Sequence, residues 1–243
     1  MTDCMMTVAR GCGMAGMESL EQGSVHMVCA DLPSGETRAK TDRPISLERF
    51  WSAARHCLRA DGNVVLMASS LRFASKVLGS NPASFKYDLV WHKSMATGFY
   101  NARRRPLRAH EFVLIFGTPD SYYDPQMTES GKPMRSWVKG AKGHGENYGR
   151  GHRVMTRAGA MDRYPRSVLE HPVVGTSAKG RTHPQQKPHG LLERLVRAYS
   201  PHYGLVVDPC AGSGSCGVAA RVAGRRFLGW DLYFEPPQQE LFA

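Results

Sequence analysis

The segment of residues 205–231 constrains this chain most, because it predicts a strand, a tight turn, a helix and a second strand in close succession. The first strand, 205–208, is apolar and ends on an acid. A Gly-Ser-Gly turn at 212–214 opens a helix predicted over 213–222, and the second strand spans 226–231. Two strands joined by a helix through short connections are typical of a parallel crossover unit. The pattern predicts an α/β fold with a mostly parallel sheet.

The turn within this unit has the features of a nucleoside site. Gly212 and Gly214 would let a ligand approach the backbone closely, and the helix that follows offers unpaired amides to a carboxylate. Asp231 ends the next strand, where an acidic side chain would accept hydrogen bonds from ribose hydroxyls. A Gly-x-Gly turn alone is more often structural, so the prediction depends on the flanking strand, the helix and the second acid.

A second crossover unit is predicted near the N-terminus. The apolar strand 25–30 stops at the turn-forming residues 31–35, and Ser46 precedes an amphipathic helix over 47–58. A strand over 63–68 follows. Further elements are expected as strands around 89–91 and 111–116 and as a helix over 190–199.

Residues 118–182 differ from both flanks. Gly, Pro, Lys, Arg, His and Tyr dominate there, and no long apolar period survives. We therefore expect a basic, loop-rich insertion into one α/β domain. The end of the chain after Asp231 is acidic and contains Pro and Gln, which is typical of a tail or a short final helix.

The charge of the chain favours a polyanionic partner. The 243 residues carry a formal net charge of +11, which favours nucleic acid, although many basic proteins carry such a charge merely for solubility. No apolar run approaches the roughly 18 residues of a membrane span, and the sequence MTDCMMTVARG lacks the features of a secretory signal. The six cysteines form no C-x-x-C pair, so we expect a cytoplasmic protein with reduced thiols and without a structural zinc.

Four motifs resemble those of the circularly permuted, beta-group amino-methyltransferases of DNA, especially a phage-type adenine-N6 subgroup. Residues 31–35 are similar to the family's D-P-P-Y or D-L-P-Y loop with its following glycine. Residues 91–111 resemble the subgroup's W-x-K-x-x-x-T-G-F-x-N-A-x-x-R-P-L-R-x-H-E block. Residues 183–188 resemble H-P-T-Q-K-P, and residues 208–214 resemble D-x-F-x-G-x-G. The resemblance covers nearly the whole chain in the family's order of catalytic loop, target-recognition insertion and cofactor loop.

This resemblance implies a Rossmann-like methyltransferase fold that depends on S-adenosyl-L-methionine and is circularly permuted. Residues 1–117 would form its catalytic half, residues 118–182 the target-recognition insertion and residues 183–243 the cofactor-binding half. The implied reaction methylates the N6 amino group of an adenine flipped out of double-stranded DNA. Asp at the first loop position favours adenine, and cytosine-N4 methylation is the alternative. No metal is implied, and a homodimer and a phage or restriction-modification setting are compatible with the resemblance.

The resemblance assigns catalysis to the loop Asp31, Leu32, Pro33 and Ser34. The Asp31 carboxylate and the Leu32 carbonyl would accept hydrogen bonds from the target amino group and keep its lone pair available for in-line attack. Pro33 would stiffen the loop. Cofactor contacts are implied for Cys12, Lys187, Asp208, Cys210, Gly212, Ser213, Gly214 and Asp231. Lys187 would lie near the carboxylate end of the cofactor.

Basic residues in the 91–111 block would hold DNA phosphates while the base is flipped. The DNA-binding residues expected there are Lys93, Tyr100, Arg103, Arg104, Arg105 and Arg108. In the insertion, the cationic residues expected to read the DNA sequence are Lys132, Arg135, Lys139 and Lys142. A run of arginines is otherwise a solvated face, so charge alone does not identify the contacts.

Three positions depart from the family pattern. Ser34 replaces an aromatic residue that stacks on the flipped base, an interaction worth roughly 1–3 kcal/mol per base. Tyr100 is a candidate substitute, and the other interpretation is that Tyr100 is simply packed. Cys12 replaces an acid that contacts the adenine of the cofactor, and Gln185 replaces a threonine. These changes keep a second function open, that of a DNA-binding relative with impaired catalysis.

Overall fold

The computed structural model describes residues 5–134, 159–175 and 186–233. The chain divides into two units. The first comprises Met1–Asp124 together with Ser167–Ala243, and the second comprises Pro125–Arg166.

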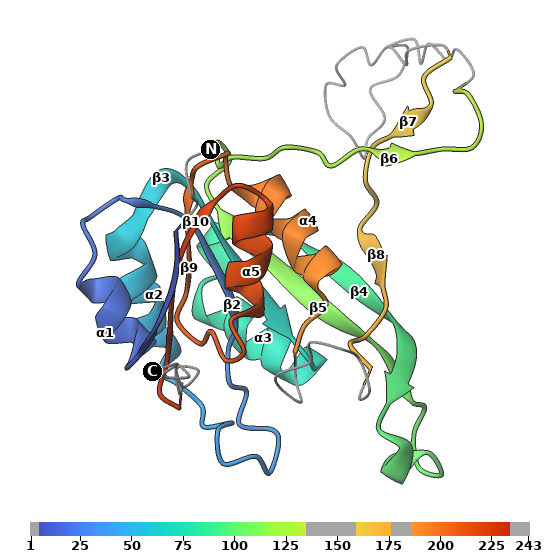
Figure 1. Cartoon of the computed structure of the whole chain (residues 1–243). Helices are drawn as coiled ribbons and strands as arrows, with labels where there is room; N and C mark the ends of the chain where they lie inside the picture. The colour runs from blue at the N-terminus through green and yellow to red at the C-terminus, as the bar shows by residue number, and fades with distance from the viewer. Residues whose placement is uncertain (1–4, 135–158, 176–185, 234–243) are drawn as a thin grey trace, which may run out of the picture. The chain divides into compact units, whose positions relative to one another are not determined.

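An eight-stranded sheet forms the centre of the first unit, in the order β1-β10-β9-β2-β3-β5-β4-β8 (Figure 1). Of these eight strands, β5 alone runs against the others, and the pairs that exclude it are parallel. The predicted mostly parallel α/β sheet is therefore confirmed. The strands are β1 (Met6–Arg10), β2 (Val25–Asp31), β3 (Leu58–Ala68), β4 (Phe85–Thr97), β5 (Arg108–Gly117), β8 (Val168–His171), β9 (Leu205–Asp208) and β10 (Arg226–Asp231), and in the second unit β6 (Thr128–Glu129) and β7 (Asp162–Arg163).

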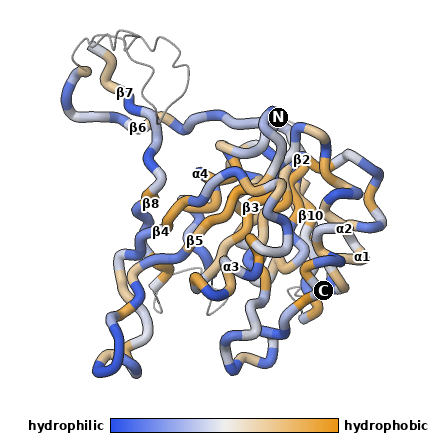
Figure 2. Tube along the Cα trace, turned by 180° about the vertical axis from the view of Figure 1, so that it is seen from behind, coloured by the Kyte–Doolittle hydropathy of each residue, from blue (hydrophilic) through white to orange (hydrophobic). Residues whose placement is uncertain are grey.

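Helices cover both faces of the sheet, which explains why the central strands are apolar throughout. The helices are α1 (Gly13–Glu18), α2 (Leu47–Cys57), α3 (Leu71–Ser80), α4 (His189–Tyr199) and α5 (Ser215–Val222). On one face, α1, α2 and α3 share a core with Val64 and Leu66 of β3. On the other face, α4 and α5 share a core with Val65 and Met67 of the same strand. Figure 2 shows the central strands as the most hydrophobic part of the trace.

Some predicted boundaries move in the structure. The helix predicted over 47–58 ends at Cys57, because β3 already begins at Leu58 and pairs there with Val25. β4 and β5 extend beyond their predicted cores, since their outer halves are polar and carry no apolar run. β1, α1 and α3 were not predicted: β1 is a largely exposed edge strand, and α1 has only six residues.

The second unit is narrower than the insertion predicted over 118–182. Its described residues include a two-stranded antiparallel sheet of β6 and β7. β8 follows it and returns to the first unit, where it pairs with β4. Lys132 is exposed, whereas three other cations predicted to read the sequence lie outside the described residues: Arg135, Lys139 and Lys142.

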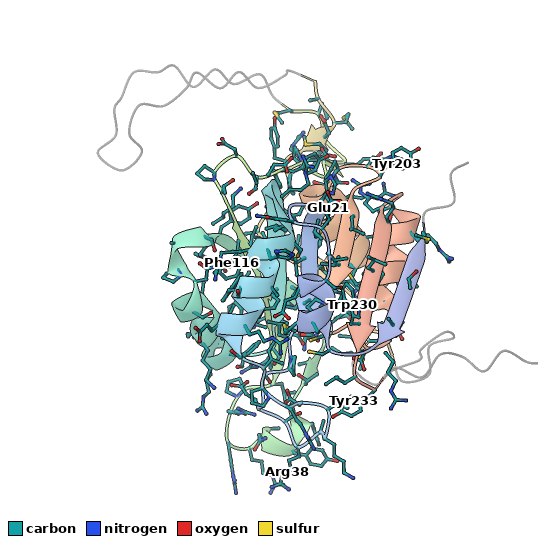
Figure 3. The ribbon with its side chains drawn as sticks, turned by 90° about the vertical axis from the view of Figure 1, so that its left-hand side faces the viewer. Glu21, Arg38, Phe116, Tyr203, Trp230 and Tyr233 are labelled. Carbon is teal, nitrogen blue, oxygen red and sulfur yellow. The ribbon has the colours of Figure 1, made fainter. Side chains whose placement is uncertain are left out.

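Several predicted site residues lie at one edge of the sheet, the one formed by the carboxyl ends of the parallel strands. β2, β9 and β10 are neighbours and end at Asp31, Asp208 and Asp231. The tip of the β4-β5 hairpin reaches the same edge, because β5 runs antiparallel to β3 and begins where β3 ends. Figure 3 shows Arg38 and Tyr233, which follow β2 and β10, at the same end of the first unit.

Candidate active site

Asp31, Asp208 and Asp231 place three carboxyl groups on neighbouring strands at one edge of the sheet. Asp208 is 5% exposed, and its Oδ1 accepts a hydrogen bond from the amide of Cys210 at 2.9 Å. Burial raises the pKa of Asp208 to about 8 against the effect of that amide, and the carboxylates of Asp31 and Asp231 add to the rise. A positively charged ligand group at this edge would oppose that rise and favour the ionised form of Asp208.

The loop after β9 is tied to the end of β10. The amide of Gly212 donates to Oδ2 of Asp231 at 3.2 Å. Gly214 has a φ of +72°, which favours glycine, and α5 begins after it at Ser215 rather than at the predicted Ser213.

The start of α1 packs against the same loop. A β-carbon at Gly13 would overlap the carbonyl oxygen of Pro209, so glycine is required for this approach of two backbones. Burial, followed by the nearby carboxylates, raises the pKa of the Cys210 thiol above its usual range, so this group is a neutral thiol. The loop, the segment before α1 and the ends of β9 and β10 together contain most of the predicted cofactor residues. They are Cys12, Asp208, Cys210, Gly212, Ser213, Gly214 and Asp231.

A chain of ion pairs extends from Asp31 into the protein. Nζ of Lys187 lies 2.9 Å from Oδ2 of Asp31 and 2.9 Å from Oε2 of Glu111. Nζ of Lys93 lies 2.5 Å from Oε1 of Glu111. The side chains of Lys93, Glu111 and Lys187 are 7%, 9% and 12% exposed, whereas that of Asp31 is 35% exposed. Asp31, at one end of this ion-pair chain, is therefore accessible, and the other three residues are enclosed.

Trp91 lies beside both ammonium groups of this chain. Its ring centroid is 5.3 Å from Nζ of Lys93 and 5.8 Å from Nζ of Lys187, within the range of a cation–π interaction. Its indole Nε1 donates to the carbonyl of His171 at 2.9 Å. Because His171 ends β8, this strand fixes the ring that supports both lysines.

The charge states of the chain follow from burial and pairing. Burial raises the pKa of Asp31, and Lys187 opposes this rise without reversing it. Burial also acts to raise the pKa of Glu111, but Lys187 and Lys93 hold it below its usual value. Burial acts to lower the pKa of Lys187, but Asp31 and Glu111 hold it above its usual value. Lys187 and Glu111 are therefore charged at neutral pH.

Two predicted site residues, Lys93 and Lys187, have ion-pair partners that the sequence did not indicate. Lys93, predicted to bind DNA, is buried against Glu111, because it follows Trp91 on the inward face of β4, where side chains alternate with a period of two. Its charge is not presented to a phosphate. Lys187 pairs with Asp31 and Glu111, and its position near the carboxylate of the cofactor stays a prediction.

The segment after β2 is braced by Asp42. The two carboxylate oxygens of Asp42 accept hydrogen bonds from the amides of Gly35 and Thr37, both at 2.8 Å. The hydroxyl of Ser34 lies 3.5 Å from each of these oxygens and accepts a hydrogen bond from the amide of Glu36 at 3.2 Å. Ser34 therefore helps to shape the loop.

The same loop is anchored at two further points. Leu32 is 3% exposed and belongs to the core beneath α2 and α3, and Pro33 beside it is half-buried. The carboxylate of Glu36 accepts a hydrogen bond from the hydroxyl of Ser70 at 2.5 Å. Because Ser70 is the N-cap of α3, the loop is attached to a helix as well as to the core.

The tip of the β4-β5 hairpin carries exposed aromatic and basic side chains. Phe99 is 80% exposed and Tyr100 is fully exposed, so the interpretation that Tyr100 is packed is wrong. Residues 103–105, three arginines, are also exposed, and Figure 2 shows the end of this hairpin as hydrophilic. The guanidinium of Arg108 instead donates to the carbonyl of Ser69, which attaches the base of the hairpin to the end of β3.

The interpretation of the sequence missed Glu111 and Asp42 as site residues. A charge at the head of the apolar run 111–116 is the signal that points to Glu111. Asp42 has no comparable signal, because its partners depend on the path of the loop. Gln185 lies outside the described residues.

Within the described ranges, no three His, Cys, Asp or Glu side chains are grouped to hold a metal ion, and no helix is long and apolar enough to cross a membrane.

The fold is similar to those of solved DNA methyltransferases. The structure of M1.HpyAVI in complex with SAM aligns over 93% of this chain and 93% of that chain, with a TM-score of 0.60 and 19% identity. The cytosine-N4-specific PvuII DNA methyltransferase aligns over 93% of this chain and 81% of that chain, with a TM-score of 0.64 and 14% identity. At these identities the likeness establishes the fold, and it confirms the predicted methyltransferase architecture.

Curated relatives match over shorter stretches. The type II methyltransferase M2.DpnII of Streptococcus pneumoniae is 49% identical over 49 residues, which are 20% of this chain and 18% of that protein. The DNA adenine methyltransferase YhdJ of Escherichia coli is 43% identical over 53 residues, which are 22% of this chain and 18% of that protein. The matches span 18 to 33% of the length of such relatives.

A family comparison extends over most of the chain. The DNA methylase family model matches residues 25–235, from the first residue of β2 to a point beyond β10. This range contains the loop after β2, the ion-pair chain and the loop after β9. Because the match covers far more than half of the 243 residues, the chain belongs to the N6/N4 DNA methylase family.

Proposed function

We propose that this chain transfers a methyl group from S-adenosyl-L-methionine to the N6 amino group of an adenine flipped out of double-stranded DNA. One observation carries the proposal. Asp31 ends a strand that is a neighbour of the strand ending at Asp208, and Lys187 holds the Oδ2 atom of its carboxylate. An oriented acceptor for an amino group thus lies beside the edge that favours a positively charged ligand.

The residues at this edge fit S-adenosyl-L-methionine, which when bound supplies a methyl group on a positively charged sulfur. Asp31 and Asp231, with Asp208 on the strand between them, favour a nearby cation, whose charge would lower the raised pKa of Asp208. Asp231 would accept hydrogen bonds from the ribose, and the amides at the start of α5 would receive the carboxylate of the cofactor. The close approach of Gly13 to Pro209 keeps this loop in place.

The target amino group would be held by Asp31 and Leu32. The closest contact of Lys187 is with Oδ2, so we assign Oδ1 of Asp31 to the amino group. The backbone carbonyl of Leu32 would accept its second hydrogen bond. Since Leu32 is buried and Pro33 follows it, both acceptors are fixed before the substrate binds. Two fixed acceptors direct the nitrogen lone pair at the methyl group, which is catalysis by orientation.

The hairpin tip would hold the DNA. The exposed arginines 103–105 would contact phosphates, and the fully exposed Tyr100 would stack on the flipped base in place of the missing aromatic residue at position 34. We assign target recognition to the basic insertion over 118–182, which includes the second unit.

Ser34 favours a second candidate function. Its hydroxyl lies 3.5 Å from the Asp42 carboxylate and caps the amide of Glu36, so it offers no face for stacking on a base. A chain without this stacking partner would bind DNA and methylate it poorly.

Asp31 at the head of the loop supports adenine as the target over cytosine.

Transfer of labelled methyl from S-adenosyl-L-methionine to unmethylated duplex DNA, followed by nucleoside mass spectrometry, tests the proposal, with Asp31→Ala as control. N6-methyladenine that disappears with Asp31→Ala is the expected result. N4-methylcytosine would reassign the target base. DNA binding without any methylated nucleoside would favour the second candidate.

A further inference from the structure

The ion-pair chain Asp31–Lys187–Glu111–Lys93 joins four separate segments of the first unit. Asp31 ends β2, Lys187 precedes α4, Glu111 lies in β5 and Lys93 lies in β4. Two carboxylates and two ammonium groups make the chain electrically neutral. Lys187 and Glu111 each have an ion-pair partner on both sides. Lys93, at the enclosed end, has Glu111 and the ring of Trp91 as partners.

Such a chain is an expensive way to stabilise a fold. Removing charges from water is strongly unfavourable, and well-packed apolar side chains of similar volume often stabilise a protein as well or better. Lys93 and Glu111 are nevertheless almost completely enclosed. The accessible end of the chain is Asp31, which the proposed function uses.

We propose that Glu111 and Lys93 are positioning residues for methyl transfer, which fix Lys187 so that Lys187 holds Oδ2 of Asp31 and leaves Oδ1 to the target amino group. This inference rests on the proposed function, in which Asp31 receives that group. Neither Glu111 nor Lys93 touches the reacting atoms in this assignment. Both act through Lys187, because Glu111 is the second acceptor of its ammonium group and Lys93 neutralises Glu111.

The charge balance predicts opposite effects for the two residues. Lys187, Glu111 and Asp42 act on the pKa of Asp31, and Asp208 on the neighbouring strand interacts with it as well. Without the charge of Glu111, Lys187 forms an ion pair with Asp31 alone, so the pKa of Asp31 falls. Without Lys93, Glu111 draws Lys187 more strongly, so the pKa of Asp31 rises.

The experiment is a titration of Asp31 by NMR, with ¹³C-labelled aspartate and with Asp31→Asn to identify its signal. We expect the midpoint to move to lower pH in Glu111→Gln and to higher pH in Lys93→Met. Glu193→Gln removes a surface ion pair with Arg197 on α4 and is the matched control, in which the midpoint stays unchanged. Thermal unfolding establishes that each variant is folded, and Glu111→Met and Lys93→Gln, which also remove the charge, replace any variant that is not.

Folded variants whose midpoints stay in place, or move in the same direction, would overturn the inference. A second measurement uses methyl transfer: kcat falls by about tenfold or more while KM for DNA and cofactor stays within about twofold, as expected when orientation is impaired. The titration does not require activity. An inactive wild-type chain would therefore contradict the proposed function and leave the titration result standing.

Discussion

Nζ of Lys187 lies 2.9 Å from Oδ2 of Asp31, although the motifs that contain these residues stand far apart in the sequence. Replacing Lys187 by Met leaves Asp31 and Glu111 without their shared cation. We expect kcat to fall about 100-fold, because a small misplacement of a reacting group has an effect of this size. The free energy of unfolding should fall by roughly 3 kcal/mol, because removing one partner leaves a buried charge uncompensated.

Single-turnover methyl transfer and urea denaturation measure these two losses. Lys76→Met is the control, because Lys76 is an exposed lysine of α3 outside the ion-pair chain. Similar losses in both variants would show that the effect follows the removal of any lysine charge.

Asp208 should make the protein less stable as the pH rises. Its pKa is raised from 3.8 to about 8, so the folded protein keeps a proton that the unfolded chain has released between these values. The folded state then binds more protons than the unfolded state. The contribution of Asp208 to the free energy of unfolding is therefore fully present below the lower pKa and is lost as the pH rises toward 8. Asp31 has a raised pKa and contributes with the same sign.

Thermal unfolding of wild type and Asp208→Asn between about pH 5 and 8.5 measures this contribution. We expect the wild type to lose more stability than the variant across this range. Parallel curves for the two proteins would mean that Asp208 is already ionised in the folded state.

Tyr100→Ala should weaken capture of the flipped base. Stacking is worth roughly 1–3 kcal/mol per base, so kcat/KM should fall by about one to two orders of magnitude. Tyr100→Phe keeps the ring and is the matched control, with kcat/KM close to that of the wild type. Unchanged activity in Tyr100→Ala would rule out the substitution of Tyr100 for an aromatic residue at position 34.

The arginines of the hairpin tip should determine part of the salt dependence of DNA binding. Replacing residues 103–105 by serine should reduce the slope of log K against log salt by about 0.9 for each phosphate that the protein no longer neutralises. Fluorescence anisotropy at several salt concentrations measures the slope. Arg221→Ser, at the far end of α5, is the control and should keep the wild-type slope. An unchanged slope in the triple variant would place the phosphate-binding residues elsewhere.

The fold was predictable where apolar runs are continuous. β2, β9 and β10 lie inside the sheet with a neighbouring strand on each side, so they carry apolar runs, which end on the acids that mark the site. β1 lies at the sheet edge with mostly exposed residues, so its sequence has no such run. The outer half of β4 is polar because most of its side chains are exposed near the tip of the hairpin.

The site was predictable as a set of residues and less so as a set of contacts. The motifs indicate Asp31 and Lys187, but their pairing depends on where the end of β2 lies relative to the start of α4, which no local pattern records. Lys93 illustrates the limit, because a lysine within a basic block favours a DNA contact. Its position on the inward face of β4 instead buries it against Glu111.

The two residues of the first unit that flank the second unit in the sequence are each held by a backbone hydrogen bond within the first unit. The amide of Asp124 donates to the carbonyl of Ala198 at 2.9 Å, and the amide of Val90 donates to the carbonyl of Ser167 at 2.8 Å. The described residues of the segment between these anchors, 125–134 and 159–166, contribute no strand to the eight-stranded sheet. An insertion or deletion between these two anchors would therefore lengthen or shorten the second unit and leave the described strand pairings of the eight-stranded sheet unchanged.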